Sequence, residues 1–249
     1  MDTDQIRIAL RQVASKDKAI ILARFFKTGK GEYGEGDKFL GVIVPEQRKI
    51  VRRYFSDKMS STVKHTLSVV RELLRSNYHE ERLTALLILV ELFKKSGEKE
   101  RQLLFDFYLE SLNYVNNWDL VDVSAPTIVG MYLLDKDPSV LFNLASSGHL
   151  WSRRVAVLAT FAFIKTGRYD EILSLAETIL IDKKESHDLM HKAIGWMLRE
   201  VGKRDRGALD SFLDRFAASM PRTALRYAIE KLPDAARSRY LKATRSLCR

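Results

Sequence analysis

The sequence predicts an all-α protein built from successive helices, and three observations lead to that prediction. Apolar residues recur at spacings of three and four along most of the chain, which is the period of a helix with a buried face. No extended alternation of apolar and polar residues, the pattern of a half-buried strand, competes with it. Gly and Pro are scarce, with 12 and 5 residues among 249, which argues against a turn-rich all-β chain.

Helical segments follow one another with short breaks between them. They are expected at residues 2–27, 46–56, 60–76, 79–95, 98–115, 117–134, 138–147, 149–166, 168–181, 186–203, 207–219, 221–232 and 234–246. Ser60 and Asp137 are expected N-caps, the latter with Pro138 at the first helical position. Gly97 and Gly148 stand where one helix is expected to end and the next to begin.

Two of these helices carry clear apolar stripes. In 79–95 the stripe consists of Leu83, Leu86, Leu87, Val90 and Phe93, and Ile88 and Leu89 widen it. We therefore expect this helix to be buried on more than one side. In 149–166 the corresponding residues are Val155, Leu158, Ala159, Ala162 and Phe163.

Pairs of helices give a coarse period of about 30–40 residues from about residue 60 onward, the length of HEAT or armadillo hairpins. A length of 249 residues allows one large domain or two small ones. We expect a single repeat domain over 1–249, with N-terminal helices and a Gly-rich loop in 1–59 and stacked hairpins in 60–249. Such a stack curves and offers a concave face to an extended partner. A globular helical bundle is the alternative.

Residues 29–45 are the exception to the helical pattern, with five glycines in GKGEYGEGDKFLG. The spacing differs from GxxxxGK[ST], so a phosphate-binding P-loop is not expected. Two interpretations stay open: an ordered loop that offers backbone N–H donors to a phosphate, or a connector between helices.

The charge is positive and uneven, with a net charge of +10 and a pI near 9.6. Residues 183–249 hold 16 Lys/Arg against 8 Asp/Glu, whereas residues 1–182 are nearly balanced. This asymmetry favours an anionic partner, most often nucleic acid, over solvated helix faces alone. No free basic amphipathic segment favours membrane binding.

A single cysteine, Cys248, excludes an internal disulfide framework and a Cys-based structural zinc site. No signal peptide or long uncharged apolar window is present. These features predict a soluble cytoplasmic protein. His187 and His191 stand at helical i, i+4 spacing, but HDLMH lacks the Glu of HExxH. We expect no metal and no cofactor, and Cys248 is a poor candidate nucleophile in its basic tail.

Three short blocks contain tryptophan beside charged residues. In NNWDLVDVSAP, Trp118 and Asp122 stand four apart, hence on one helix face, and Asn116 or Asn117 is placed to cap that helix. Taken alone, the pattern is more typical of a core tryptophan with an aspartate at the solvent edge. Trp151 precedes Arg153 and Arg154 in a first helical turn, where arginine opposes the helix dipole and often has an anionic partner. Trp196 follows Gly195, which leaves room for close packing.

Taken together, GEYGEGDKFLGVIVPEQRKIVRRY, NNWDLVDVSAP, LWSRRVAVLAT and HKAIGWMLREVGKRD resemble the AlkD-type DNA alkylation repair proteins, in the right order over residues 20–240. The resemblance implies DNA glycosylases built as a right-handed α–α superhelix of HEAT-like repeats, with a concave DNA-binding face. It also implies an open cleft without a pocket for a flipped base. By motif position, the two tryptophans and the aspartate around the lesion correspond to Trp118, Trp196 and Asp122.

The cleft arginine of the resemblance corresponds to Arg154, or else to Arg153. We expect a set of basic and aromatic residues to contact DNA: Arg153, Arg154, Trp151, Lys203 and Arg204. The expected partner is duplex DNA containing alkylated bases, bound by a monomer. Because one carboxylate can stabilise only an already labile cationic lesion, we expect excision of 7-methylguanine or 3-methyladenine and little action on uracil or hypoxanthine. Two alternatives stay open: a non-catalytic DNA-binding repeat protein for damaged or branched DNA, and a protein-binding helical scaffold.

Overall fold

The computed structural model describes residues 2–56, 62–181 and 187–243, and within these ranges the regular structure is helical. The all-α prediction is therefore confirmed. The chain forms two compact units, Met1–Ile128 and Val129–Arg249, described in turn below. The prediction of a single repeat domain depends on how these two units join, so it stays a prediction. None of the helices in the described ranges has the length and apolar character needed to cross a membrane.

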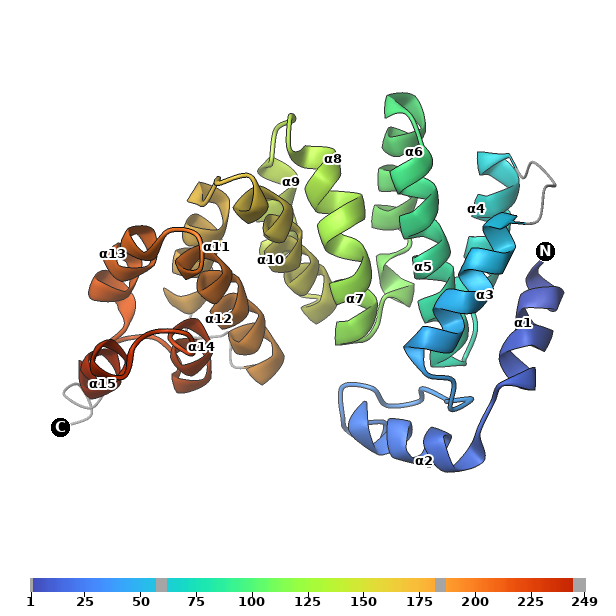
Figure 1. Cartoon of the computed structure of the whole chain (residues 1–249), viewed down its shortest axis with the longest axis horizontal. Coiled ribbons are helices and arrows are strands. Elements are labelled where there is room, and N and C mark those ends of the chain that lie inside the picture. Colours follow the sequence, from blue (N-terminus) through green and yellow to red (C-terminus); the bar gives the residue numbers. More distant parts are fainter. Residues whose placement is uncertain (1, 57–61, 182–186, 244–249) are drawn as a thin grey trace. The chain divides into compact units, whose positions relative to one another are not determined.

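The N-terminal unit is organised around one central helix (Figure 1). Its helices are α1 (Thr3–Gln12), α2 (Lys16–Phe25), α3 (Val44–Ser56), α4 (Val63–Leu74), α5 (His79–Lys95), α6 (Glu98–Glu110) and α7 (Trp118–Ala125). Helix α5 packs against α3, α4 and α7. Its apolar stripe is wide enough to face all of them, and Ile88 and Leu89 are fully buried. The predicted burial of this helix on more than one side is confirmed.

The prediction of one helix over 2–27 is wrong, because the chain breaks between α1 and α2. Ser15 ends the break: its side chain accepts the Lys18 N–H and caps α2, while its own N–H donates to the Leu40 carbonyl. Gly41 packs against this turn with φ +80°, and a Cβ there would lie 2.0 Å from the Ser15 carbonyl oxygen. The break is thus set by a loop that lies 25 residues further along the chain.

The C-terminal unit contains α8 (Met131–Leu133), α9 (Ser139–Ala145), α10 (Leu150–Lys165), α11 (Asp170–Ile181), α12 (Asp188–Gly202), α13 (Arg206–Phe216), α14 (Arg222–Ala228) and α15 (Asp234–Ala243). Helix α10 packs against α9 and α12, and α12 packs against α13 and α14 (Figure 1). The predicted stripe of α10, from Val155 to Phe163, is buried. These contacts between successive helices are the expected stacking of hairpins.

Several predicted boundaries need correction. The single helix expected at 117–134 consists of α7, a π-helical turn at Pro126–Gly130, and α8, because Pro126 has no N–H to continue the α-helical ladder. The helix expected at 98–115 ends at Glu110 and is followed by a 3-10 turn, Leu112–Tyr114. Helix α9 begins at Ser139, one residue later than expected, and the Asp137 carboxylate accepts the Ser139 N–H at 2.9 Å. Ser60 lies outside the described residues.

Candidate functional site

The start of α7 holds the first pair of predicted site residues. Asn117 is the N-cap of this helix, and its side-chain oxygen accepts the Trp118 N–H at 2.8 Å. Because α7 is helical from Trp118 onward, Trp118 and Asp122 lie on the same face, one turn apart. Both residues are half-buried, so each is supported by the protein and still accessible from outside.

An aromatic stack supports the Trp118 ring. Phe26 stacks on Trp118 with ring centroids 5.2 Å apart, and Phe39 stacks on Phe26 at 5.3 Å. Phe25 meets Trp118 edge to face at 5.7 Å, although 59% of Phe25 is exposed. Sequence analysis did not single out these phenylalanines. The sequence feature that could have indicated them is the pair of adjacent aromatic residues at the end of α2, immediately before the Gly-rich segment.

A buried ion network lies next to this stack. His79, the first residue of α5, contacts Asp119 through Nε2 at 2.8 Å and Asp37 through Nδ1 at 3.4 Å. Arg82 pairs with Asp37 at 2.7 Å, and the Asn116 amide donates to the same carboxylate at 3.0 Å. The network therefore connects the Gly-rich loop, the start of α5 and the first turn of α7. Asp119, which follows Trp118, fixes the orientation of α7.

The charge states of this network follow from its geometry. Burial alone disfavours a charged imidazole, but the carboxylates of Asp119 and Asp37 outweigh that effect and raise the pKa of His79 to about 9. Burial also opposes ionisation of Asp37, yet its contacts with His79, Arg82 and Asn116 lower the pKa of Asp37. At neutral pH the network therefore contains two cations, His79 and Arg82, and two carboxylates. The imidazolium ring also stacks on Phe39 at 4.8 Å.

Three backbone N–H groups near the end of the Gly-rich segment donate to one carboxylate of the protein itself. The Glu80 carboxylate accepts the N–H groups of Leu40, Gly41 and Val42 at 2.9, 2.8 and 3.1 Å. Glu80 thus takes the place that a bound phosphate would occupy. Of the two interpretations left open for residues 29–45, this arrangement favours a structural connector.

Asp122 influences one further group of the same unit. Burial raises the pKa of Tyr108, and the negative charge of Asp122 adds to that effect, although the hydrogen bond between the Tyr108 and Ser124 hydroxyls opposes it. The Tyr108 hydroxyl is therefore protonated near neutral pH. The carboxylate of Asp122 lies near the buried interface between α6 and α7.

The C-terminal unit holds a second aromatic pair with cations beside it. Trp196 on α12 is half-buried, and its ring lies 6.3 Å from that of Phe161 on α10. The Lys165 ammonium is 4.4 Å from the Phe161 ring centroid, and the Arg204 guanidinium is 5.9 Å from it. Arg204 and Lys203 are exposed, and both pair with Glu200 at 3.1 and 2.6 Å. Burial opposes ionisation of Glu200, but these two cations lower its pKa.

The residues of the WSRR block differ in accessibility. Arg154 is only 4% exposed, and its guanidinium donates to the Leu189 carbonyl at 2.6 Å, which ties α10 to the start of α12. Trp151 is also buried. Arg153 is half-buried and donates to the Ser147 carbonyl at 3.0 Å. This accessibility favours Arg153 over Arg154 as a contact to an external ligand, and the assignment of either to DNA stays a prediction.

One of the two helix histidines has a structural role. His187 is the N-cap of α12, where its ring Nδ1 accepts the Leu189 N–H at 3.2 Å. Both His187 and His191 are half-buried. Cys248 lies outside the described residues.

Gly195 allows α12 and α14 to approach closely beside Trp196, so Gly195→Ala should destabilise the protein. A Cβ at this position would lie 2.4 Å from the Ala224 carbonyl oxygen and 2.5 Å from the Tyr227 Cβ. Overpacking of this kind should lower the thermal midpoint by about 3–10 °C, measured by circular dichroism. The matched control is Gly148→Ala, because a Cβ at Gly148 meets nothing within 4 Å. Equal melting of both variants would contradict the close packing.

The stacked helical hairpins define a helical-repeat protein. Its aromatic rings beside a half-buried carboxylate suit the binding of a charged ligand. The chain belongs to the family of DNA alkylation repair enzymes, whose family model matches residues 6–232. Membership in this family gives the protein a role in DNA repair, with DNA as its substrate. A search among curated proteins finds no match.

A solved structure shares the fold. It is described as a predicted DNA alkylation repair enzyme from Enterococcus faecalis, and the two chains align with a TM-score of 0.70. The alignment covers 89% of this chain and 97% of that chain, with 16% sequence identity. The likeness establishes the stacked helical architecture, and it does not extend to the chemistry of the site.

Proposed function

We propose that this protein is an AlkD-type DNA glycosylase, which hydrolyses the N-glycosidic bond of cationic alkylated purines in duplex DNA. The substrates are 7-methylguanine and 3-methyladenine. The observation that carries the proposal is the pair formed by Trp118 and Asp122, half-buried and one turn apart on a helix anchored by a buried ion network. Membership in the family supplies the DNA substrate.

The chemistry of a cationic lesion matches a carboxylate. An N3- or N7-alkylated purine leaves as a neutral base, so the positive charge moves to the sugar and develops near C1′ as an oxocarbenium-like transition state. A carboxylate at about 4 Å, in surroundings of effective dielectric about 20, stabilises such a charge by ~4 kcal/mol. That corresponds to a rate increase of about 10³-fold. Asp122 also serves as an acceptor for the proton of the attacking water.

Aromatic faces stabilise the same charge. Trp118 is held in place by Phe26, and a cation over an indole face gains ~0.5–2 kcal/mol. Phe25 adds an exposed ring edge beside Trp118. The assignment of Trp196 to the lesion rests on motif position, with its aromatic neighbour Phe161 in support. The resemblance to AlkD-type proteins adds an open cleft without a pocket around the base, and the neutral leaving group needs no protonation.

Basic residues of the C-terminal unit are proposed to hold the phosphates of the duplex. Arg153, Lys203 and Arg204 are the accessible members of the predicted set. Lys203 and Arg204 are each paired with Glu200, so a phosphate has to compete with that carboxylate. Contacts of this kind give position without reading sequence, so binding should tolerate different sequences and weaken strongly with salt.

The test is release of bases from DNA of defined content. The protein should release 7-methylguanine and 3-methyladenine from methylated duplex, and should release uracil and hypoxanthine much more slowly. A few kcal/mol of charge stabilisation accelerates an already labile cationic lesion, whereas a neutral base needs protonation to leave. Released bases are separated and quantified by chromatography.

Two outcomes would overturn this function. Release of a neutral base at a comparable rate would contradict the electrostatic mechanism. Tight binding of methylated duplex without release of any base would identify a non-catalytic DNA-binding protein of the same fold.

A further inference from the structure

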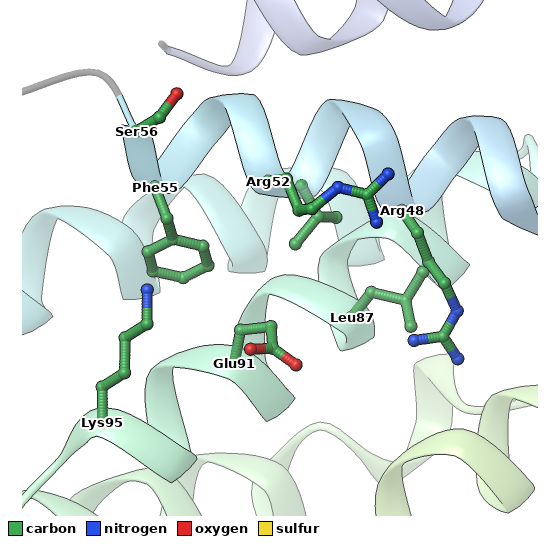
Figure 2. A pocket seen from close by; sticks show the side chains of 8 residues that line it. Arg48, Arg52, Phe55, Ser56, Leu87, Glu91 and Lys95 are labelled. Carbon is green, nitrogen blue, oxygen red and sulfur yellow. The ribbon is translucent and has the colours of Figure 1, made fainter.

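Helix α5 carries two regions of different character. Its later turns line a pocket of about 520 Å³ together with α3, through Leu87, Glu91 and Lys95 (Figure 2). Its first turn, residues 79–82, lies outside that pocket, and all four of its polar side chains are buried. The charges of this turn therefore bind other parts of the protein, and what they hold in place is the start of α7.

His79 supports Trp118 by two separate routes. The first is polar: the imidazole Nε2 lies 2.8 Å from the carboxylate of Asp119, the residue that follows Trp118 in the first turn of α7. The second is aromatic: the imidazole lies 4.7 Å from the ring of Phe26, the same ring that stacks on Trp118 at 5.2 Å. A displacement of His79 would therefore reach both the backbone and the ring of Trp118.

His79 is itself held from several directions. Its side chain is only 2% exposed, and its backbone N–H donates to the Lys38 carbonyl at 2.8 Å. Its Nδ1 contacts Asp37 at 3.4 Å, and its ring stacks on Phe39 at 4.8 Å. Arg82, in the same helical turn, pairs with Asp37 at 2.7 Å. A ring with partners at both nitrogens and a stacking neighbour has one defined orientation.

Asp119 uses both of its carboxylate oxygens inside the protein. One accepts the N–H of Leu120 at 2.9 Å, and the other contacts His79. Only 13% of this side chain is exposed. Asp119 therefore serves the structure, whereas Asp122, three residues later in the same helix, shares the face of Trp118. Because the turns of a short helix move together, the contact that fixes Asp119 also fixes Trp118 and Asp122.

We propose that His79 is a positioning residue of the reaction, which holds Trp118 and Asp122 in the geometry that the transition state requires. It acts through Asp119 and through the Phe26 ring. This inference rests on the proposed function, because it concerns the same site. Catalysis by a positioned charge is sensitive to geometry, and a displacement of about 1 Å can lower a rate about 10²-fold. Duplex affinity depends mainly on phosphate contacts, so it should change little.

The kinetic test compares two variants that remove the contact with one that keeps it. His79→Gln and Asp119→Ala should each lower the single-turnover rate of 7-methylguanine release by about tenfold or more. Their dissociation constants for methylated duplex should stay within about threefold of the wild type. Asp119→Asn should retain the rate within about threefold, because its amide can donate to Nε2 while the Nδ1–H of the neutral imidazole donates to Asp37.

The matched control is Glu81→Gln, in the same turn of α5. Glu81 is as deeply buried as His79, but it pairs with Arg7 and Arg11 of α1, at 3.1 and 3.3 Å. This variant should melt at a lower temperature, because it breaks a buried ion pair, and should keep the wild-type rate of base release. The control thus separates loss of stability from loss of position. An equal loss of rate in Glu81→Gln would overturn the proposal.

A spectroscopic test follows Trp118 without any base release. Protein labelled with 5-fluorotryptophan gives one ¹⁹F resonance for each of its three tryptophans, and Trp118→Phe assigns that of Trp118. In His79→Gln this resonance should shift or broaden, while those of Trp151 and Trp196 in the C-terminal unit stay in place. Glu81→Gln should leave all three unchanged.

This readout separates the two proposals. A wild type that releases no base would refute the glycosylase activity, and the ¹⁹F spectra would still decide whether His79 positions Trp118. Asp119→Ala changes a less buried side chain, so it gives the same readout should His79→Gln not fold. An unchanged Trp118 resonance in Asp119→Ala would overturn the proposal, and so would wild-type base release by that variant.

Discussion

Asp122→Asn should reduce the release of 7-methylguanine by about 10²–10³-fold, while the affinity for methylated duplex changes little. The amide is nearly the same size as the carboxylate but carries no charge, so the variant loses the stabilisation of the cationic sugar. Duplex affinity rests mainly on phosphate contacts, and a carboxylate contributes nothing favourable to these. Single-turnover kinetics with saturating protein measures the loss in the chemical step.

Asp106→Asn is the matched control for that experiment. Asp106 is an exposed carboxylate on α6 of the same unit, so the variant removes the same charge from another helix. We expect base release by this variant to equal that of the wild type. Near wild-type release by Asp122→Asn would show that another group stabilises the transition state.

His79→Gln should lower the free energy of unfolding by about 3–5 kcal/mol at pH 6.5. The substitution removes one of the two cations from a buried network and leaves the Asp119 carboxylate without its 2.8 Å partner. Loss of one partner from a buried ion pair is costly because the remaining charge stays desolvated. Urea denaturation followed by circular dichroism measures the change.

The same histidine gives the wild type a characteristic pH dependence. Its pKa is about 9 in the folded protein and near 6.5 when unfolded, so the folded state binds the proton more tightly. The resulting stability is fully present below about pH 6.5 and is lost as the pH rises through 9, a decrease on the order of 3 kcal/mol. His79→Gln should lack this decrease, whereas the exposed His65→Gln on α4 should retain it. A wild-type stability that is flat between pH 6.5 and 9 would contradict a charged His79.

Much of the fold was predictable because helical periodicity is a local property. The stripes of α5 and α10 repeat at three and four residues, and their burial followed directly. The division between α1 and α2 was not predictable in the same way. Helix α1 ends at Gln12, and Ser15 caps the start of α2 while its N–H meets the Leu40 carbonyl. That contact comes from the fold rather than from the neighbouring sequence.

The candidate site was predictable only in its helical part. The spacing of Trp118 and Asp122 placed both on one face, as the structure has them. The supporting aromatic stack and ion network depend on where the Gly-rich loop lies, which periodicity does not encode. One signal was present in the sequence. His79 to Arg82 are four consecutive polar residues at the start of a helix whose wide apolar stripe predicts burial on more than one side, and all four are buried.

The first turn of α5 also has a consequence for folding. In an ideal array of repeats each hairpin contacts only its neighbours, so folding can begin anywhere and stability is a sum of local increments. Here Glu81 pairs with Arg7, 74 residues earlier, and Asp37 accepts from Asn116, 79 residues later. Contacts between residues so far apart in the sequence close large loops. The chain loses the entropy of loop closure before these contacts stabilise the fold. We therefore expect the N-terminal unit to fold as one cooperative unit, in which loss of α1 would remove the Arg7 partner of Glu81 at the start of α5.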